Sequence, residues 1–302
     1  MIHNQVSSNI KALMESLSFP ENAQAELLSS LDKMLNDDDA ATELDAIMSI
    51  YDENEFCDYA GMLERMELAG KKIGVHEYTS QMLLYLSLSE RLKERYIERG
   101  IDLDIFYASM KDLSYKLEEC RLIYDIVGSF TKNWFQGFYN LTRFTLGRLQ
   151  FEIRQYDVDL TIDGVHINKD TKVLNVHIPR TGGSLDHDEV LKSYDFAASF
   201  FAKELGEEVI FHCSSWLLDP FHSTILSPNS NIMKFINDFT ITTTDMYTDY
   251  SSVWRLFDKM YNGNVDELPA DSSLRRAYID RIKANQPTGW GRGFIVYKKK
   301  TK

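Results

Sequence analysis

The apolar pattern of this chain changes its period near Leu146, and the change limits the folds that the chain can adopt. Before that point apolar residues recur every three or four positions, as the leucines of residues 27–35 do, which is typical of one face of a helix. After it, apolar and polar residues alternate over 149–154, which is typical of a half-buried strand. We therefore predict an all-helical N-terminal domain over residues 1–145 and a β-containing domain over residues 146–302.

The second domain has a segment order that favours a mixed sheet. Strand patterns at 158–162 and 172–178 follow the first strand. Turn residues, either Asp163 and Gly164 or Lys169 and Asp170, then predict an antiparallel meander. Residues 173–213 then read as strand, glycine loop, helix and strand. Such a βαβ unit makes its two strands parallel and its crossover right-handed. The fold class is therefore α+β, with helices flanking a mixed sheet.

The remaining elements follow from local patterns. We predict a helix over 186–204 and parallel strands at 173–178 and 209–213. Further along we predict helices at 231–235 and 272–284, strands at 240–244, 253–257 and 294–297, and a turn at 289–291.

Composition excludes several classes of protein. The 302 residues carry a net charge of −13, and residues 1–145 hold 25 acidic against 14 basic side chains. An acidic chain is a poor partner for nucleic acid or an anionic membrane, so we expect neither. The three cysteines are widely spaced and no HxH, HExxH or CxxC pattern occurs, so we expect no disulfide framework and no metal. Residues 1–17 lack a signal-peptide layout, which favours the cytoplasm.

The loop over residues 179–184 admits two interpretations. Backbone N–H groups before a helix form an anion site, because they lack partners and lie at the positive end of the dipole. Gly182 and Gly183 would let a phosphate approach closely, with Arg180, Thr181 and Ser184 as further donors. Alternatively, the two glycines make only a tight turn.

Five segments together resemble a known family. The chain is similar to bacterial N-acyltransferases that join a helical N-terminal domain to a GNAT-like C-terminal domain. The resemblance rests on LGRLQFE at 146–152, VHIPRTGGSL at 176–185, CSSWLLDP at 213–220, PNSNI at 228–232 and DELP at 266–269.

The resemblance implies a donor and a place for it. GNAT proteins hold the pyrophosphate of acyl-CoA on an R/Q-x-x-G-x-G/A loop. Arg180 and Gly183 match that pattern in register, whereas Leu185 stands where Gly or Ala is usual. Acyl-CoA is therefore the implied co-substrate, bound by residues 180–184.

Acyl transfer to an amine needs a base, and the strands offer two candidates. His177 lies on the strand that enters the loop, on the same face as Asn175, and Glu152 lies on the first strand. A structural histidine and a solvated strand face are the alternatives for these two residues.

Cys213 is read as a core residue. Trp216 and Trp290 are read as core aromatics or as the lining of an acyl or acceptor pocket.

Two functions remain open at this point. The first is an acyl-CoA-dependent N-acyltransferase that acts on a small-molecule amine, with His177 or Glu152 as base. The second is a non-catalytic GNAT-like binding module that contacts a partner protein through the acidic helical domain. The sequence carries no signal for an oligomeric state.

Overall fold

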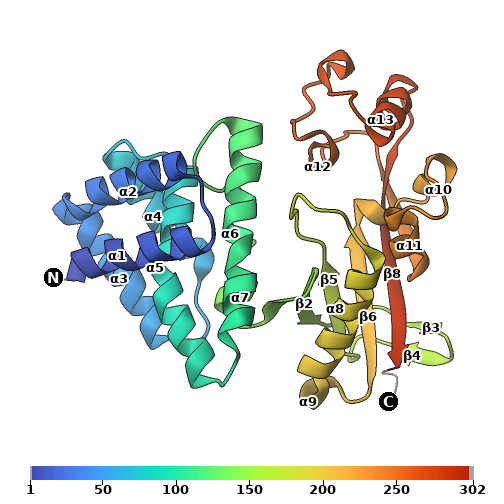
Figure 1. Ribbon diagram of the computed structural model, residues 1–302, viewed down its shortest axis with the longest axis horizontal. Helices are drawn as coiled ribbons and strands as arrows, with labels where there is room; N and C mark the ends of the chain where they lie inside the picture. Colours follow the sequence, from blue (N-terminus) through green and yellow to red (C-terminus); the bar gives the residue numbers. More distant parts are fainter. Residues whose placement is uncertain (1, 299–302) are drawn as a thin grey trace. The chain divides into compact units, whose positions relative to one another are not determined.

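The computed structural model describes residues 2–298, which divide between Phe144 and Thr145 into two compact units (Figure 1). The described part of the chain before Arg143 contains helices and loops and no strand, which confirms the helical prediction for the first half. Its helices are α1 (Ile2–Ser16), α2 (Glu21–Leu35), α3 (Asp38–Glu53), α4 (Tyr59–Lys72), α5 (Glu77–Glu98), α6 (Leu103–Tyr124) and α7 (Gln136–Tyr139).

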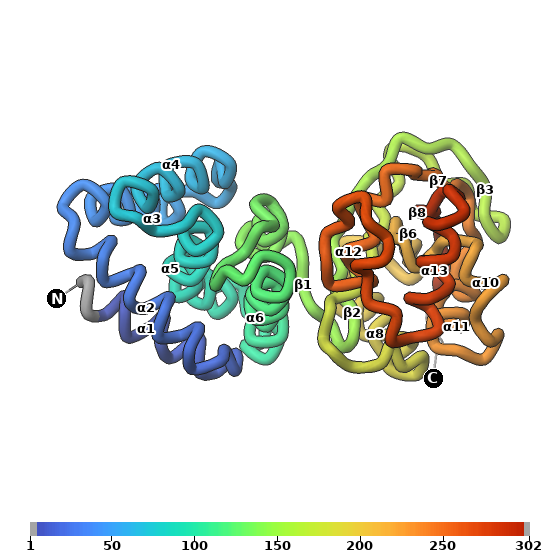
Figure 2. Tube along the Cα trace, turned by 90° about the horizontal axis from the view of Figure 1, so that it is seen from above, coloured from blue at the N-terminus to red at the C-terminus, as the bar shows by residue number. Residues whose placement is uncertain are grey.

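Helix α5 is the centre of the helical unit. Every side chain from Thr79 to Ser89 is buried, so this helix is covered on all sides. Helices that follow one another along the chain pack side by side, as α3, α4 and α5 do (Figure 2). The carboxylates of Asp37, Asp58 and Asp102 accept backbone N–H groups where α3, α4 and α6 begin.

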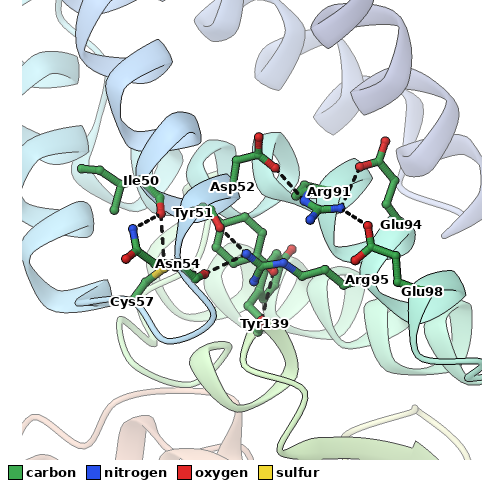
Figure 3. Close-up of polar contacts among 10 residues, drawn as sticks. All are labelled: Ile50, Tyr51, Asp52, Asn54, Cys57, Arg91, Glu94, Arg95, Glu98 and Tyr139. Carbon is green, nitrogen blue, oxygen red and sulfur yellow. Dashed lines mark hydrogen bonds and ion pairs between the residues drawn. The ribbon is translucent and has the colours of Figure 1, made fainter.

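A buried arginine joins α5 to the end of α3. The guanidinium of Arg95 donates to the carbonyl oxygens of Tyr51 and Asn54, the second at 2.8 Å, and lies 4.1 Å from the centre of the Tyr51 ring. Figure 3 shows Arg91, one helical turn earlier, between Asp52, Glu94 and Glu98. Because the charge of Arg95 is buried, its bonds to two carbonyls are needed to offset the loss of water.

The second unit is built on a mixed sheet of six strands in the order β1-β2-β5-β6-β8-β7. Strands β5 and β6 are parallel, which confirms the predicted βαβ unit, and β2–β5, β6–β8 and β7–β8 are antiparallel. The strands are β1 (Arg143–Leu146), β2 (Leu149–Arg154), β3 (Leu160–Ile162), β4 (Val165–Ile167), β5 (Val173–His177), β6 (Glu208–Ser215), β7 (Thr240–Tyr247) and β8 (Thr288–Lys298).

The predicted meander is wrong in one respect, because β3 and β4 form a separate two-stranded sheet. Asp163 and Gly164 both have positive φ, so the chain reverses within two residues and β3 pairs only with β4. Ile162 and Ile167 of this hairpin pack on Val173, Ile210 and Phe294 of the main sheet. Strand β2 pairs instead with β5.

Short helices complete the unit, and α8 covers the other face of the sheet. The ring of Tyr194 on α8 lies 4.9 Å from that of Phe211 on β6. Figure 1 shows α12 and α13 gathered at one end of the sheet. The helices are α8 (His187–Phe200), α9 (Ala202–Leu205), α10 (His222–Ile225), α11 (Asn231–Asn237), α12 (Trp254–Phe257) and α13 (Ser273–Lys283), with 3₁₀ turns at Trp216–Leu218 and Val265–Glu267.

Two further local predictions are wrong. The predicted strand at 253–257 is instead helix α12 with Val253 as its N-cap, because Val253 and Phe257, one helical turn apart, are both buried in a small apolar core with Tyr278. Residues 289–291 lie inside β8 and not in a turn. Gly291 is needed there for close packing, since an added Cβ would lie 2.2 Å from the carbonyl oxygen of Leu218.

The turn between β1 and β2 gives a test of this packing. Gly147 has φ +75°, and an added Cβ would lie 2.6 Å from Oγ of Ser193. We expect Gly147→Ala to lower the free energy of unfolding of the second unit by about 2–4 kcal/mol, through backbone strain and overlap. Gly164→Ala, at φ +81° with open space around it, should lower that free energy by only about 1 kcal/mol. Equal losses in urea titrations would show that Ser193 moves aside at no cost.

Candidate functional site

The parallel strands β5 and β6 separate at the end where β5 stops. Their pairing ends at Val176 and Cys213, although β6 continues to Ser215 with β8 on its other side. The chain leaves β5 through His177 and enters the loop at Pro179. The end of this pairing thus leaves the last residues of β6 without a β5 neighbour, and His177 and the glycine loop follow directly from the same end of β5.

The structure brings the two predicted bases together. Nε2 of His177 lies 3.4 Å from Oε2 of Glu152, and the amide nitrogen of Asn175 lies 2.9 Å from the same ring nitrogen. The antiparallel pairing of β2 with β5 places Glu152 opposite Asn175, which puts all three side chains on one face. Glu152 is nearly buried, and Nη2 of Arg154 lies 2.9 Å from its Oε1, whereas one fifth of the His177 side chain is exposed.

A second layer of polar groups holds Asn175 in place. Its Oδ1 accepts from the hydroxyl of Tyr156 at 2.9 Å and lies 2.9 Å from Nδ1 of His212. Burial lowers the pKa of His212 to about 4, helped by the charges of Arg292 and His177, so this ring is neutral near pH 7. Burial also raises the pKa of Tyr156 to about 12. Tyr156 carried no signal in the sequence, because it reaches the cluster only through the chain's path after β2.

The glycine loop lies open in front of helix α8. Gly182 has φ +75°, and an added Cβ there would meet nothing within 4 Å. The helix itself begins at His187 and is capped by Asp186, whose carboxylate accepts the N–H groups of Asp188 and Glu189. The Asp186 carboxylate therefore already accepts the N–H groups of the first helical turn. An anion bound by the loop would have to bind to N–H groups of residues before Asp186.

Arg180 is engaged with another part of the unit. Its guanidinium forms an ion pair with Asp258, which follows α12, and about one third of the Arg180 side chain is exposed. Asp258 also pairs with Nη2 of Arg275 at 2.7 Å, so it has two cationic partners. Thr181 bonds within the loop, since its Oγ1 accepts from the N–H of Gly183 at 3.3 Å.

Ser184 and the start of α8 are tied to α11. The amide nitrogen of Asn231 donates to Oγ of Ser184 at 2.7 Å. Nε2 of His187 lies 2.9 and 3.1 Å from the two carboxylate oxygens of Asp238, and burial raises the pKa of Asp238. The pairing of His187 with Asp238 was missed in the sequence, because nothing local links the two positions.

Cys213 and several other polar and aromatic residues belong to the core or border the site. Cys213 is fully buried, as predicted. Asp219 caps the turn before α10 by accepting from the N–H of Phe221 at 3.0 Å, and His222 is buried against the hydroxyl of Tyr278 at 2.9 Å.

Trp290 borders the site. Its indole N–H donates to Oγ of Ser214 at 2.8 Å, which places this ring beside the end of β6 that no longer pairs with β5.

Residues 2–298 contain no group of three or more His, Cys, Asp or Glu side chains that could hold a metal ion. Among the helices that the structure describes, none combines the length and the apolar character needed to cross a membrane.

Comparisons with known proteins match both halves of the chain. Residues 8–141 match a family model described as the N-acyltransferase N-terminal domain, and residues 143–295 match one described as the GNAT-like C-terminal domain. No curated protein matches significantly.

Solved structures share the fold of the whole chain. An acyltransferase mutant in complex with octanoyl-CoA is 24% identical with a TM-score of 0.76, over 96% of this chain and 88% of its own. An acyltransferase in complex with decanoyl-CoA and teicoplanin is 24% identical with a TM-score of 0.65, over 95% of this chain and 99% of its own.

Proposed function

The chain belongs to the N-acyltransferases that join a helical N-terminal domain to a GNAT-like C-terminal domain, and we propose that it acylates the amino group of a small molecule. The donor is acyl-CoA. The observation that carries the proposal is the pair of His177 and Glu152, 3.4 Å apart, where β5 and β6 separate. Medium-chain acyl groups are the first donors to test, because similar structures were solved with octanoyl-CoA and decanoyl-CoA.

The chemistry assigned to this pair is removal of a proton from the amine. Amines are protonated near neutral pH, so the nucleophile must lose a proton to expose its lone pair. The imidazole of His177 takes that proton, and the nearby carboxylate of Glu152 stabilises the positive charge that forms. The amine nitrogen then forms a bond to the thioester carbon and gives up a second proton. The carbon–sulfur bond breaks, and the departing thiolate takes up that proton, so CoA leaves as a thiol.

The loop residues suit the pyrophosphate of the donor. Gly182 and Gly183 are exposed, and added Cβ atoms there would meet either nothing within 4 Å or only Oγ1 of Thr181 at 3.6 Å. A phosphate can therefore approach the main chain closely. The pantetheine arm would run from this loop past the end of the β5–β6 pairing, where strand N–H groups can donate to a thioester oxygen.

The test is an acyl-transfer assay with the whole chain. Octanoyl-CoA and decanoyl-CoA are offered with a panel of amino sugars, amino acids and aminoglycosides, and thiol release and amide products are measured. We expect thiol release that depends on the amine and a matching amide by mass spectrometry. Binding of acyl-CoA without amine-dependent release across the panel would favour the non-catalytic module instead.

A further inference from the structure

Arg148 lies in the turn between β1 and β2, and its backbone is fixed against α8. Its N–H donates to Oγ of Ser193 at 2.7 Å, and Ser193 is fully buried. The positive φ of Gly147 brings the turn this close to the helix. The Arg148 side chain therefore starts from a well-defined position.

The Arg148 guanidinium bonds to both ends of the glycine loop. Nη1 donates to the carbonyl oxygen of Pro179 at 3.1 Å, and Nε donates to that of Ser184 at 3.3 Å. These two carbonyls belong to the first and last residues of the loop. A planar guanidinium presents donors in a rigid fork, so it can hold two acceptors at a set distance and angle.

The bonds to Arg148 also fix where two backbone donors point. In a trans peptide the C=O and N–H lie in one plane and point in opposite directions. The carbonyls of Pro179 and Ser184 face Arg148, so the N–H groups of Arg180 and Leu185 point away from it. Over residues 2–298 the structure gives neither N–H a hydrogen-bond acceptor.

We propose that Arg148 is a positioning residue for the acyl donor, which orients the loop N–H groups toward the pyrophosphate without contacting it. The inference rests on the proposed function. Asn231 also bonds to the loop, but it holds the side chain of Ser184 and leaves the peptide planes free to turn. The guanidinium of Arg148 bonds to the carbonyl oxygens of Pro179 and Ser184, so it fixes the orientation of these two peptide planes.

The first experiment tests the clamp alone, without any ligand. Trypsin cleaves after arginine, so cutting between Arg180 and Thr181 reports how far the loop opens. Arg148→Ala should speed this cut about tenfold. The control is Arg276→Ala, which removes a guanidinium that donates to the carbonyl of Ala270 and not to a carbonyl of the glycine loop, and it should leave the cutting rate unchanged. An unchanged cutting rate in Arg148→Ala would overturn the clamp whatever the protein's function.

The second experiment tests the link to the donor. Initial rates are measured with octanoyl-CoA and with octanoyl-pantetheine, which lacks the pyrophosphate. Arg148→Ala should raise KM for octanoyl-CoA about tenfold, leave kcat within about twofold, and leave both constants for octanoyl-pantetheine unchanged. Arg148→Lys should recover only part of the loss, because an ammonium cannot hold both carbonyls in the geometry of the fork.

Three results would overturn the proposal. Equal losses with both donors would show a general structural role. Full recovery in Arg148→Lys would show that charge matters and the fork does not. A looser loop with unchanged KM would show that the loop does not hold the donor. Failure of the proposed function itself would appear separately, as a wild-type chain that transfers no acyl group from either donor.

Discussion

His177→Ala is expected to lower kcat for acyl transfer by about 100- to 1,000-fold, which is the usual contribution of a positioned general base. Glu152→Gln should lower kcat less, by about tenfold, because it keeps the shape of the carboxylate and removes only the charge that stabilises the protonated ring. His177 and Glu152 lie on neighbouring strands, and neither belongs to the loop that we assign to the pyrophosphate. Affinity for CoA should therefore stay within a few-fold of wild type in both variants.

The chain supplies a matched control for His177. His166 on β4 also lies near a carboxylate, 3.7 Å from Oδ1 of Asp159, but both side chains are mostly exposed and neither is among the predicted site residues. His166→Ala should leave kcat unchanged. Rates are measured at saturating donor and amine, and calorimetry with CoA checks that the site is intact. A His177→Ala variant that keeps more than one fifth of the activity would mean that His177 serves the sheet and that another group is the base.

The features that the sequence predicts are those that local periodicity determines. The change from helical to strand spacing near Leu146 is visible because the two patterns differ in period over many residues. The parallel pair β5–β6 follows from strand, loop, helix and strand in order, since a crossover of that length returns the chain in the same direction. Features that depend on pairing between distant segments carried no such signal, and the pairing of β2 with β5, which leaves β3 and β4 as a separate sheet, is one of them.

In the candidate site, too, single residues could be predicted from local patterns, but the contacts between them could not. His177 and Glu152 were each chosen from a local strand pattern, but their proximity depends on the register that sets Glu152 opposite Asn175. Burial of His212 and the approach of Tyr156 require the folded sheet, so no spacing rule could place them beside Asn175. The bonds from Arg148 to the loop were hidden for the same reason, because the two segments meet only when β2 pairs with β5.

Arg180→Ala is expected to weaken CoA binding by about 10- to 100-fold, because a charge-assisted bond to phosphate is worth about 1.5–3 kcal/mol. The guanidinium now pairs with Asp258, so binding of the donor requires Arg180 to exchange this carboxylate or to share its remaining donors. The exchange leaves no uncompensated charge, since Asp258 keeps its bond to Arg275. A partly exposed ion pair contributes little stability, so Arg180→Ala should change the unfolding midpoint only slightly.

Asp258→Asn should show whether the phosphate of the donor displaces Asp258 from Arg180 or binds to Arg180 beside it. If Asp258 competes with the phosphate for Arg180, removing its charge should tighten CoA binding about two- to fivefold, and the gain should vanish when Arg180→Ala is added. If the guanidinium binds both groups at once, Asp258→Asn should leave affinity unchanged while Arg180→Ala still weakens it. Calorimetry with CoA on the wild type, the two single variants and the double variant separates these routes. Unchanged affinity in Arg180→Ala would exclude both and remove Arg180 from the donor site.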